Sequence, residues 1–453
     1  MKNNFNNKTT IQRYSMALVV ASLNILGDAY NPFEFMDNSN PSFEECYLKI
    51  RESFETIPTA RVLGEIRTKD LAVVGEYALK ENFSENCTES FLQRDNKMAL
   101  INRTNLIVCA TKPLQNGLPL FRCANEWRSL ISLQYDNYLA SGLDIPIMLW
   151  DIACCLAVER HLDEYIFVCE NSHLNPENLI SNFKKLLSPI TCYPRSILAV
   201  QEFPKEGSAN RAALLNVIEQ EEMSWTEMFD VGFIYSKSIN ALNFIHSPLG
   251  TEPRSVVSSV QQLLQELPDL QELPNLVDDE LLRLGTTARK TIVMDVGEDL
   301  RIVAVHVKEF KTEDGTAFLA RYLRSLCDEK RLNIMVGDTN IPTATKASIF
   351  ATSVRVCNLT LHTHLGCITT RKRRSELHGQ IYDSAKCLRV VAAHKDFALS
   401  WCGPAKDKIQ GMWECSDAIL HPDLVKETSL LLPNADWPSD HCLVKIVLQP
   451  VSG

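Results

Sequence analysis

Five short segments of the sequence place a chemically active side chain at the end of an apolar run, where a β-strand would end. In chain order these side chains are Asn24 in SLNIL, Glu202 in AVQEF, His306 in AVHV, Asp338 and Asn340 in VGDTN, and Asp440 with His441 in WPSDH. A rigid scaffold presents reactive groups at strand ends and in the loops that follow them. If the five ends converge, they form a carboxylate-rich pocket that also holds imidazoles and amides. Hard oxygen ligands of this kind suit Mg²⁺ or Mn²⁺, whereas Zn²⁺ prefers nitrogen and sulfur donors.

The elements that must position these groups are predicted from hydrophobic patterning. Buried strands are predicted at 16–26, 196–203, 230–235, 291–295, 301–307, 333–338 and 442–448, and helices at 176–187 and 317–327. Pro176 stands where proline is favoured, at the first position of a helix. Clusters of strands with helices between them predict a protein built from α/β or α+β layers.

Composition bounds the class of protein. The chain has 453 residues, of which 45% are hydrophobic and 23% charged, so it buries a full-size core and is not disordered throughout. The net charge of -10 argues against a surface that is cationic everywhere, although it leaves room for a local basic groove. No apolar run reaches the roughly 18 residues of a membrane span. The 15 cysteines, an odd number scattered along a long chain, predict buried thiols in an intracellular protein, cytoplasmic or nuclear.

The segments SLNIL, QE, a strand with a histidine, GDTN and SDH, in this order, resemble the endonuclease/exonuclease/phosphatase superfamily. The resemblance covers about residues 14–449 and implies the α/β fold of deoxyribonuclease, a four-layer α/β/β/α sandwich. The form GDTN resembles this motif in the tyrosyl-DNA phosphodiesterases. The aliphatic Leu26, two positions after Asn24, instead resembles the residue at this position in the nocturnin-type deadenylases. The branch of the superfamily therefore stays open.

The long separation of two motifs predicts an insertion. Asn24 and Glu202 are 178 positions apart, farther than in the superfamily that the motifs resemble. We therefore expect residues 44–175 to be a large insertion within the domain, with a protein partner that the sequence does not identify. Residues 1–13 are polar and rich in asparagine, which predicts a flexible tail.

For individual residues, the resemblance implies a metal site and an attacking water. Glu202 resembles the principal metal-binding glutamate, and Asp440 and Asn24 match residues that hold or flank the metal. Asp338 matches the aspartate that orients or deprotonates the water, and Asn340 matches the amide that positions the phosphate. A divalent ion in such a site acts as a Lewis acid and lowers the pKa of its bound water.

The resemblance also implies roles for two histidines. His306 resembles the histidine that contacts a non-bridging phosphate oxygen, although a hydrogen-bonded core histidine is an alternative. His441 matches the histidine that stabilises the pentavalent transition state and is itself hydrogen-bonded to a further aspartate. Asp396, at the entry of the apolar segment DFALS, is the preferred candidate for that aspartate, and Asp383 is the alternative. A buried carboxylate beside His441 would raise the pKa of its imidazole and favour the charged form.

Two further groups of residues have both a functional and a structural interpretation. The run Arg371, Lys372, Arg373 and Arg374 predicts a loop with an electropositive rim for substrate phosphates, or else a solvated loop or a nuclear-localisation patch. Three tryptophans, Trp127, Trp150 and Trp225, are candidates for stacking on bases or for packing in the core.

These patterns predict a hydrolase that uses Mg²⁺ or Mn²⁺ to cleave phosphodiester bonds in nucleic acid, as a nuclease or a DNA-end phosphodiesterase, by in-line attack of water. Two alternatives stay open. One is a phosphatase that acts on a small or lipid phosphate, which the net charge of -10 favours. The other is a catalytically inactive interaction module that binds through the insertion, against which the intact acids and histidines argue.

Overall fold

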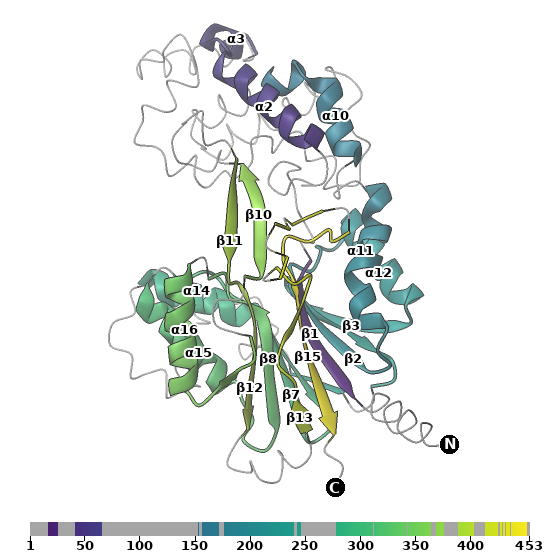
Figure 1. Cartoon of the computed structure of the whole chain (residues 1–453), viewed down its shortest axis with the longest axis vertical. Helices are drawn as coiled ribbons and strands as arrows, with labels where there is room; N and C mark the ends of the chain where they lie inside the picture. Colours follow the sequence, from purple (N-terminus) through teal and green to yellow (C-terminus); the bar gives the residue numbers. More distant parts are fainter. Residues whose placement is uncertain are drawn as a thin grey trace.

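Two β-sheets packed face to face form the centre of the molecule, and their inner faces share one apolar core (Figure 1). The computed structural model describes residues 17–25, 41–65, 153, 156–171, 176–239, 242–245, 278–310, 312–341, 343–363, 368–375, 388–402, 413–424, 426–427, 429–430, 432–434 and 436–450. The central strands of the two sheets are buried on both faces. This explains why they read in the sequence as continuous apolar runs without a polar alternation.

The first sheet, here called sheet I, has the strand order β13-β15-β1-β2-β4-β3, with β14 also paired to β15. Its strands are β1 (Leu18–Asn24), β2 (Ser196–Gln201), β3 (Met223–Met228), β4 (Val231–Ser236), β13 (Trp413–Cys415), β14 (Ile419–His421) and β15 (Leu443–Pro450). Strand β1 pairs in parallel with β2 and antiparallel with β15. The ends of β1 and β2 and the start of β15 therefore lie at the same edge of sheet I.

The second sheet, here called sheet II, has the order β5-β6-β7-β8-β12-β9. Its strands are β5 (Leu242–Ile245), β6 (Thr291–Val296), β7 (Leu300–His306), β8 (Leu332–Asp338), β9 (Thr360–Leu361) and β12 (Asp396–Cys402). Strands β7 and β8 are parallel, and β12 runs antiparallel to β8. The ends of β7 and β8 and the start of β12 are therefore at one edge, as the corresponding ends are in sheet I.

Helices cover the outer face of each sheet (Figure 1). Helices α11 (Pro176–Thr191) and α12 (Ala209–Gln220) pack on sheet I, and α14 (Asp278–Arg289), α15 (Glu313–Ser325) and α16 (Ala344–Val356) pack on sheet II. The starts of α12, α15 and α16 are fixed by the side chains of Ser208, Thr312 and Thr343, each of which accepts a backbone N–H of the first turn. The layers are helix, sheet, sheet, helix, which confirms the predicted four-layer α/β sandwich.

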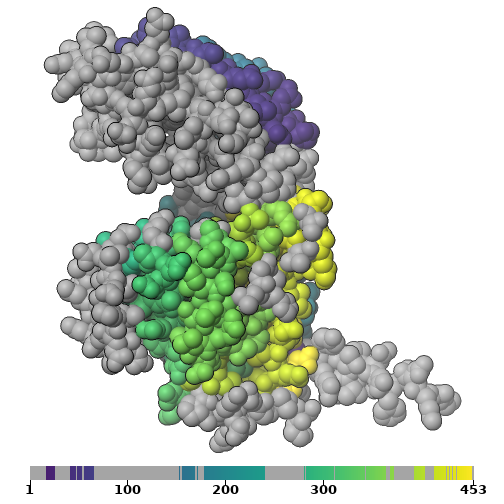
Figure 2. All heavy atoms as spheres, turned by 60° about the vertical axis from the view of Figure 1, so that its left-hand side comes forward, coloured from purple at the N-terminus to yellow at the C-terminus, as the bar shows by residue number. Residues whose placement is uncertain are grey.

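Three further helices, α2 (Pro41–Glu55), α3 (Thr59–Leu63) and α10 (Leu162–Asn171), lie beyond one end of the sandwich, where α2 packs against α10 (Figure 1). Figure 2 shows the same arrangement, with the purple atoms of α2 and α3 at one end of the molecule and the green and yellow atoms of the sandwich at the other. Along the chain, these three helices and α11 come between β1 and β2, two strands that pair directly.

One predicted element is wrong. The basic run 371–374 was expected to be a loop, but it lies in strand β10 (Thr370–Ser375), which forms an antiparallel hairpin with β11 (Leu388–Ala393). The predicted strands at 16–26, 196–203, 230–235, 291–295, 301–307, 333–338 and 442–448 and the predicted helices at 176–187 and 317–327 all correspond to observed elements. Within the described residues, no helix is long and apolar enough to span a membrane, and the cysteines are free thiols. The tail 1–13 lies outside the described residues.

Candidate active site

One row of side chains crosses three neighbouring strands at the edge of sheet II. His306 at the end of β7 is the register partner of Asp338 at the end of β8, and Asp338 is the partner of Asp396 at the start of β12. All three side chains are buried. Their positions along the strands match that of Val336, which faces the core between the sheets, rather than that of Met335, which faces the helices. Because side chains alternate along a strand, the row faces sheet I.

A second group comes from the matching edge of sheet I. The buried Asn24 ends β1, and its Nδ2 donates to Glu202 Oε1 at 3.0 Å and to Asp338 Oδ2 at 3.3 Å. One amide therefore ties together a carboxylate from each sheet. Glu202 follows β2 with a φ of 57°, a left-handed conformation that is uncommon for a residue other than glycine. The strand therefore ends at Glu202, whose carboxylate lies beside Asn24.

His441 and Asp396 form a buried hydrogen-bonded pair. His441 Nδ1 lies 2.9 Å from Asp396 Oδ2 and 3.1 Å from Asp396 Oδ1. The opposite nitrogen, Nε2, lies 3.7 Å from Asp440 Oδ1 and 3.8 Å from Asp338 Oδ2. The pair thus turns one ring nitrogen toward two further carboxylates. Asp383, the alternative partner of His441, lies outside the described residues.

The segment WPSDH is held in place by its own side chains. Ser439 Oγ donates to the carbonyl of Asn24 at 2.6 Å and accepts the backbone N–H of His441 at 3.0 Å. Trp437 Nε1 donates to the carbonyl of His441 at 2.7 Å. These bonds explain the tryptophan and the serine of the motif, because they fasten Asp440 and His441 to the end of β1.

The charges of the site shift three pKa values. Burial lowers the pKa of His441, but the carboxylates of Asp396, Asp440 and Asp338 outweigh it and raise the pKa to about 9. Burial raises the pKa of Asp338, but electrostatic interactions with His441, Lys395 and His306 outweigh it and hold that pKa below its ordinary value. For Asp396 the burial is the larger effect, and it raises the pKa. At neutral pH the site therefore holds an imidazolium beside an ionised Asp338.

The loop after β8 fixes the orientation of Asp338. The backbone N–H of Asn340 donates to Asp338 Oδ1 at 2.6 Å, and Asn340 takes a left-handed φ of 51°. Asn340 Nδ2 donates to the carbonyl of Val307 at 2.9 Å. The backbone N–H and Oγ1 of Thr339 both donate to the carbonyl of Lys395 at 2.7 Å. One carboxylate oxygen of Asp338 is thus fixed by its own loop, while the other faces Asn24.

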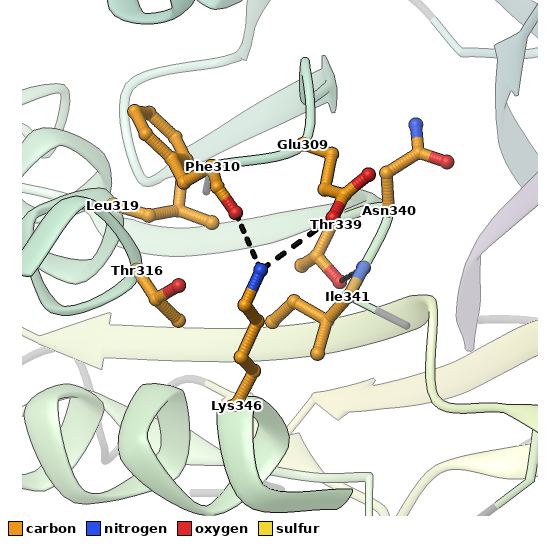
Figure 3. A pocket seen from close by; sticks show the side chains of 8 residues that line it. All are labelled: Glu309, Phe310, Thr316, Leu319, Thr339, Asn340, Ile341 and Lys346. Atoms are coloured by element: carbon orange, nitrogen blue, oxygen red, sulfur yellow. Dashed lines mark hydrogen bonds and ion pairs between the residues drawn. The ribbon is translucent and has the colours of Figure 1, made fainter. Parts of the chain in front are cut away.

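Beside this loop, a small pocket is closed by Lys346 of α16. Its ammonium donates to the carbonyl of Phe310 at 2.8 Å and lies 3.5 Å from Glu309 Oε1 (Figure 3). Figure 3 shows that Lys346 points into the pocket from the helix while Asn340 lies at its rim. Lys346 therefore ties the loop after β7 to α16, the helix that follows the loop carrying Asn340.

Three functional candidates were not found from the sequence, and these are Asp230, its ion-pair partner Lys290, and Lys395. Asp230, in the turn between β3 and β4, has its Oδ2 3.0 Å from His306 Nδ1 and 2.5 Å from Lys290 Nζ. Burial raises the pKa of Asp230, but the hydrogen bond and charge of His306, together with Lys290, lower it to about 2. An aspartate in a hairpin turn is common, so the sequence carries no specific signal for this role. The structure shows that His306, like His441, is hydrogen-bonded to a carboxylate.

The third candidate is Lys395, immediately before Asp396. Its side chain is only partly exposed, and burial would lower its pKa. Four carboxylates outweigh the burial and raise that pKa, and these are, in order of their effect, Asp338, Asp440, Glu202 and Asp396. A single ammonium therefore stands among the acids that the motifs predicted. The only sequence signal for Lys395 was its position next to Asp396, a predicted catalytic aspartate.

The predicted rim of arginines is corrected at Arg371. Only 9% of Arg371 is exposed, and its Nη1 and Nη2 donate to the carbonyls of Glu427 and Leu424 at 2.9 and 3.0 Å. Its guanidinium therefore holds a loop of the protein and is not presented to a substrate. The side chains of Arg373 and Arg374 lie outside the described part of the chain.

The donor set fits a hard divalent cation. Glu202 and Asp338 accept hydrogen bonds from the same amide nitrogen, so two carboxylates from opposite sheets are held close together. Asp338, Asp396 and His441 also bring ligand atoms within 4.8 Å of one another. Since His441 Nδ1 is already bonded to Asp396, carboxylate oxygens such as those of Glu202 and Asp440 are the better ligands. Such oxygen donors suit Mg²⁺ or Mn²⁺.

No model of a protein family matches the sequence, and no curated protein matches it. Solved structures match its fold. TDP2 of D. rerio in complex with a single-strand DNA product is 13% identical, with a TM-score of 0.35 over 60% of this chain and 93% of that one. An endonuclease/exonuclease/phosphatase family protein from Leptotrichia buccalis is 11% identical, with a TM-score of 0.34 over 61% and 94% of the two chains. An AP endonuclease from Archaeoglobus fulgidus is 12% identical, with a TM-score of 0.33 over 61% and 95%. Likenesses of this size say nothing about family membership or activity.

Proposed function

We propose that the protein is a divalent-metal-dependent hydrolase that cleaves phosphodiester bonds in nucleic acid by in-line attack of water. The observation that carries this proposal is the meeting of the two sheet edges. The buried pair of His441 and Asp396 faces Asp338, and Asn24 links Asp338 to Glu202 across the sandwich.

The arrangement matches the charge that develops during phosphodiester hydrolysis. Negative charge grows on the phosphorus oxygens and on the leaving oxygen, and preorganised donors aimed at this charge are often the largest catalytic contribution. With a pKa of about 9, His441 is an imidazolium at neutral pH and supplies such a donor. Asp338, ionised and fixed by the Asn340 N–H, is the acceptor that orients the attacking water.

We assign the metal to Glu202 and Asp440, with Asn24 holding the carboxylate of Glu202 in place. When bound, the ion supplies a Lewis acid and a template for the phosphate. We assign His306 to a non-bridging phosphate oxygen, which it would contact through Nε2 because its Nδ1 is engaged by Asp230. Asn340 positions the phosphate from the loop after β8.

A phosphatase acting on a small or lipid phosphate is the second candidate. Two observations favour it. The net charge of -10 is unfavourable for a long polyanion, and Arg371 is buried rather than presented at a rim. A small phosphate needs only cations inside the site, such as His441 and Lys395.

We further propose that residues 44–175 are an insertion within one domain of residues 14–449. This proposal is supported by the direct parallel pairing of β1 with β2, although α2, α3 and α10 come between these strands in the chain. None of the described strands that hold the site then comes from the insertion.

The test is Mg²⁺-dependent cleavage of a panel: single-stranded RNA with and without a poly(A) tail, DNA, 5′-tyrosyl DNA and phosphoinositides. The wild type is compared with Asp338→Asn and His441→Ala. Asp163→Asn, an exposed aspartate on α10, is the matched control. Loss of one activity in both site variants, with the control unchanged, supports the proposal and identifies the substrate. No cleavage of any substrate, with no Mg²⁺ binding by calorimetry, contradicts it and favours an interaction module.

A further inference from the structure

The turn between β3 and β4 consists of only two residues, Phe229 and Asp230, because Met228 pairs with Val231. Phe229 has a φ of 56°. In a two-residue hairpin a positive φ at the first position favours glycine, and a bulky side chain there is a genuine outlier. The sequence thus keeps a large aromatic ring where the backbone disfavours one. Strain of this kind is often stored at functional sites.

The Phe229 ring is not used to build the core. It is 49% exposed, whereas an aromatic side chain kept for packing is buried. The guanidinium of Arg289, the last residue of α14, lies 4.7 Å from the centre of the ring. This is a cation–π distance. A flat hydrophobic ring and a cation are therefore presented together at the surface.

The turn is fastened to the candidate active site on both sides. The carbonyl of Asp230 accepts the backbone N–H of Phe203, the residue after Glu202, at 2.8 Å. The carboxylate of Asp230 bonds His306 and Lys290, the residue after Arg289. Phe229 therefore stands one residue from the group that holds His306, at the rim of the same face.

We propose that Phe229 and Arg289 form a stacking platform for a nucleobase of single-stranded nucleic acid next to the scissile phosphate. The base stacks on the exposed part of the Phe229 ring, and Arg289 contacts an adjoining phosphate. Stacking of bases on aromatic side chains is a general mode of single-strand binding, and arginine suits phosphate. A lipid phosphate has no flat ring to stack, so the platform favours nucleic acid. The inference rests on the proposed function.

The experiment measures the contribution of bases to binding. The full chain carries His441→Ala, so that Mg²⁺ is present while turnover is blocked. Fluorescence anisotropy compares a labelled single-stranded DNA with an abasic strand of the same length. We expect the base-containing strand to bind about tenfold more tightly, within the range of one stacked base.

The variants separate stacking from folding. Phe229→Gly fits the backbone and removes the ring, so its circular dichroism is unchanged while the preference for bases disappears. Phe229→Trp keeps the preference, and Arg289→Gln weakens binding of both strands. Phe167→Ala removes another exposed phenylalanine, 46% exposed on α10, and leaves the preference intact.

Two results overturn the platform: equal binding of the two strands by the starting protein, or a preference that survives Phe229→Gly. Either can occur while the wild type still cleaves phosphodiesters, so the proposed function would stand alone. A preference that depends on Phe229, in a protein that cleaves nothing, would support the platform and contradict the proposed hydrolysis.

Discussion

Replacing Asp396 by asparagine tests the electrostatic reasoning on the site directly. Asparagine keeps the size of the side chain and an oxygen for His441 Nδ1, which now lies 2.9 Å from Asp396 Oδ2. The substitution removes a buried charge that raises the pKa of His441. The ring is expected to stay in place and to lose its positive charge at a lower pH.

The magnitude follows from the surroundings of His441. Its pKa is about 9, against the opposing effect of burial, and Asp396 is the largest of the raising charges. An opposite charge at this distance shifts a pKa by about 1–3 units, so Asp396→Asn should bring it to about 6–8. At pH 8 the charged fraction then falls from about 90% to about 10% if the new pKa is about 7. In this variant, activity that needs the imidazolium should fall about tenfold at pH 8 relative to pH 5.5.

Two measurements check this prediction. The first is kcat/KM between pH 5.5 and 10 on the substrate that the panel identifies, where the alkaline limb should move to lower pH. The second is the titration of His441 by NMR of histidine-labelled protein, with the signal assigned from its loss in His441→Ala. Asp230→Asn, which removes the carboxylate bonded to His306, is the matched control. It should leave the pH of the alkaline limb and the NMR titration of His441 unchanged.

Stability gives an independent readout with a definite sign. Because the folded-state pKa of His441 is raised, its contribution to stability is complete below the unfolded pKa of about 6.5. The contribution is lost as the pH rises through about 9. Asp396→Asn should flatten this part of the curve. If His441 still titrates at about 9 in the variant, and the two pH profiles superimpose, Asp396 is not the source of the shift.

Three further predictions concern the scaffold and the metal. Gly337→Ala places a Cβ 2.0 Å from the carbonyl oxygen of Val305 and should lower the free energy of unfolding by about 2–3 kcal/mol in urea titrations; a loss under 0.5 kcal/mol would contradict the packing. Glu202→Gln should weaken Mn²⁺ binding about tenfold by calorimetry with unchanged circular dichroism, and an unchanged affinity would remove Glu202 from the metal. Lys395→Gln should tighten Mn²⁺ binding about tenfold, because the ammonium repels a divalent ion among the same carboxylates; weaker binding would contradict this.

The central strands were predictable because they are buried on both faces. A strand such as β8 (Leu332–Asp338) is buried at every position, so the sequence shows one apolar run that ends in Asp338. The apolar run of β1 ends in Asn24 in the same way. The central strands and the places of the motif residues therefore follow from local patterns, whereas the four-layer arrangement was implied by the resemblance.

Contacts between residues from distant parts of the chain were not predictable. Asp230 reaches His306 from a hairpin 76 residues earlier in the chain, and nothing in its own segment marks it. Arg371 lies in a basic run that predicts a solvated rim, but its guanidinium bonds carbonyls 53 and 56 residues later. A local pattern carries no information on such a contact, because burial of a charged side chain is decided by the segment that covers it.

The site depends on strand register more than on any single motif residue. His306, Asp338 and Asp396 form one row only because β7, β8 and β12 pair as they do, and a slip of one residue would turn Asp338 toward the helices. Both faces of β8 are apolar, since Met335 packs under the helices and Val336 packs between the sheets, so hydrophobicity alone does not oppose such a slip. Gly337 does oppose it, because a side chain at this position would meet the carbonyl oxygen of Val305 on β7. The alignment of the row therefore depends on a close backbone approach between β7 and β8 that only the register with glycine at this position allows.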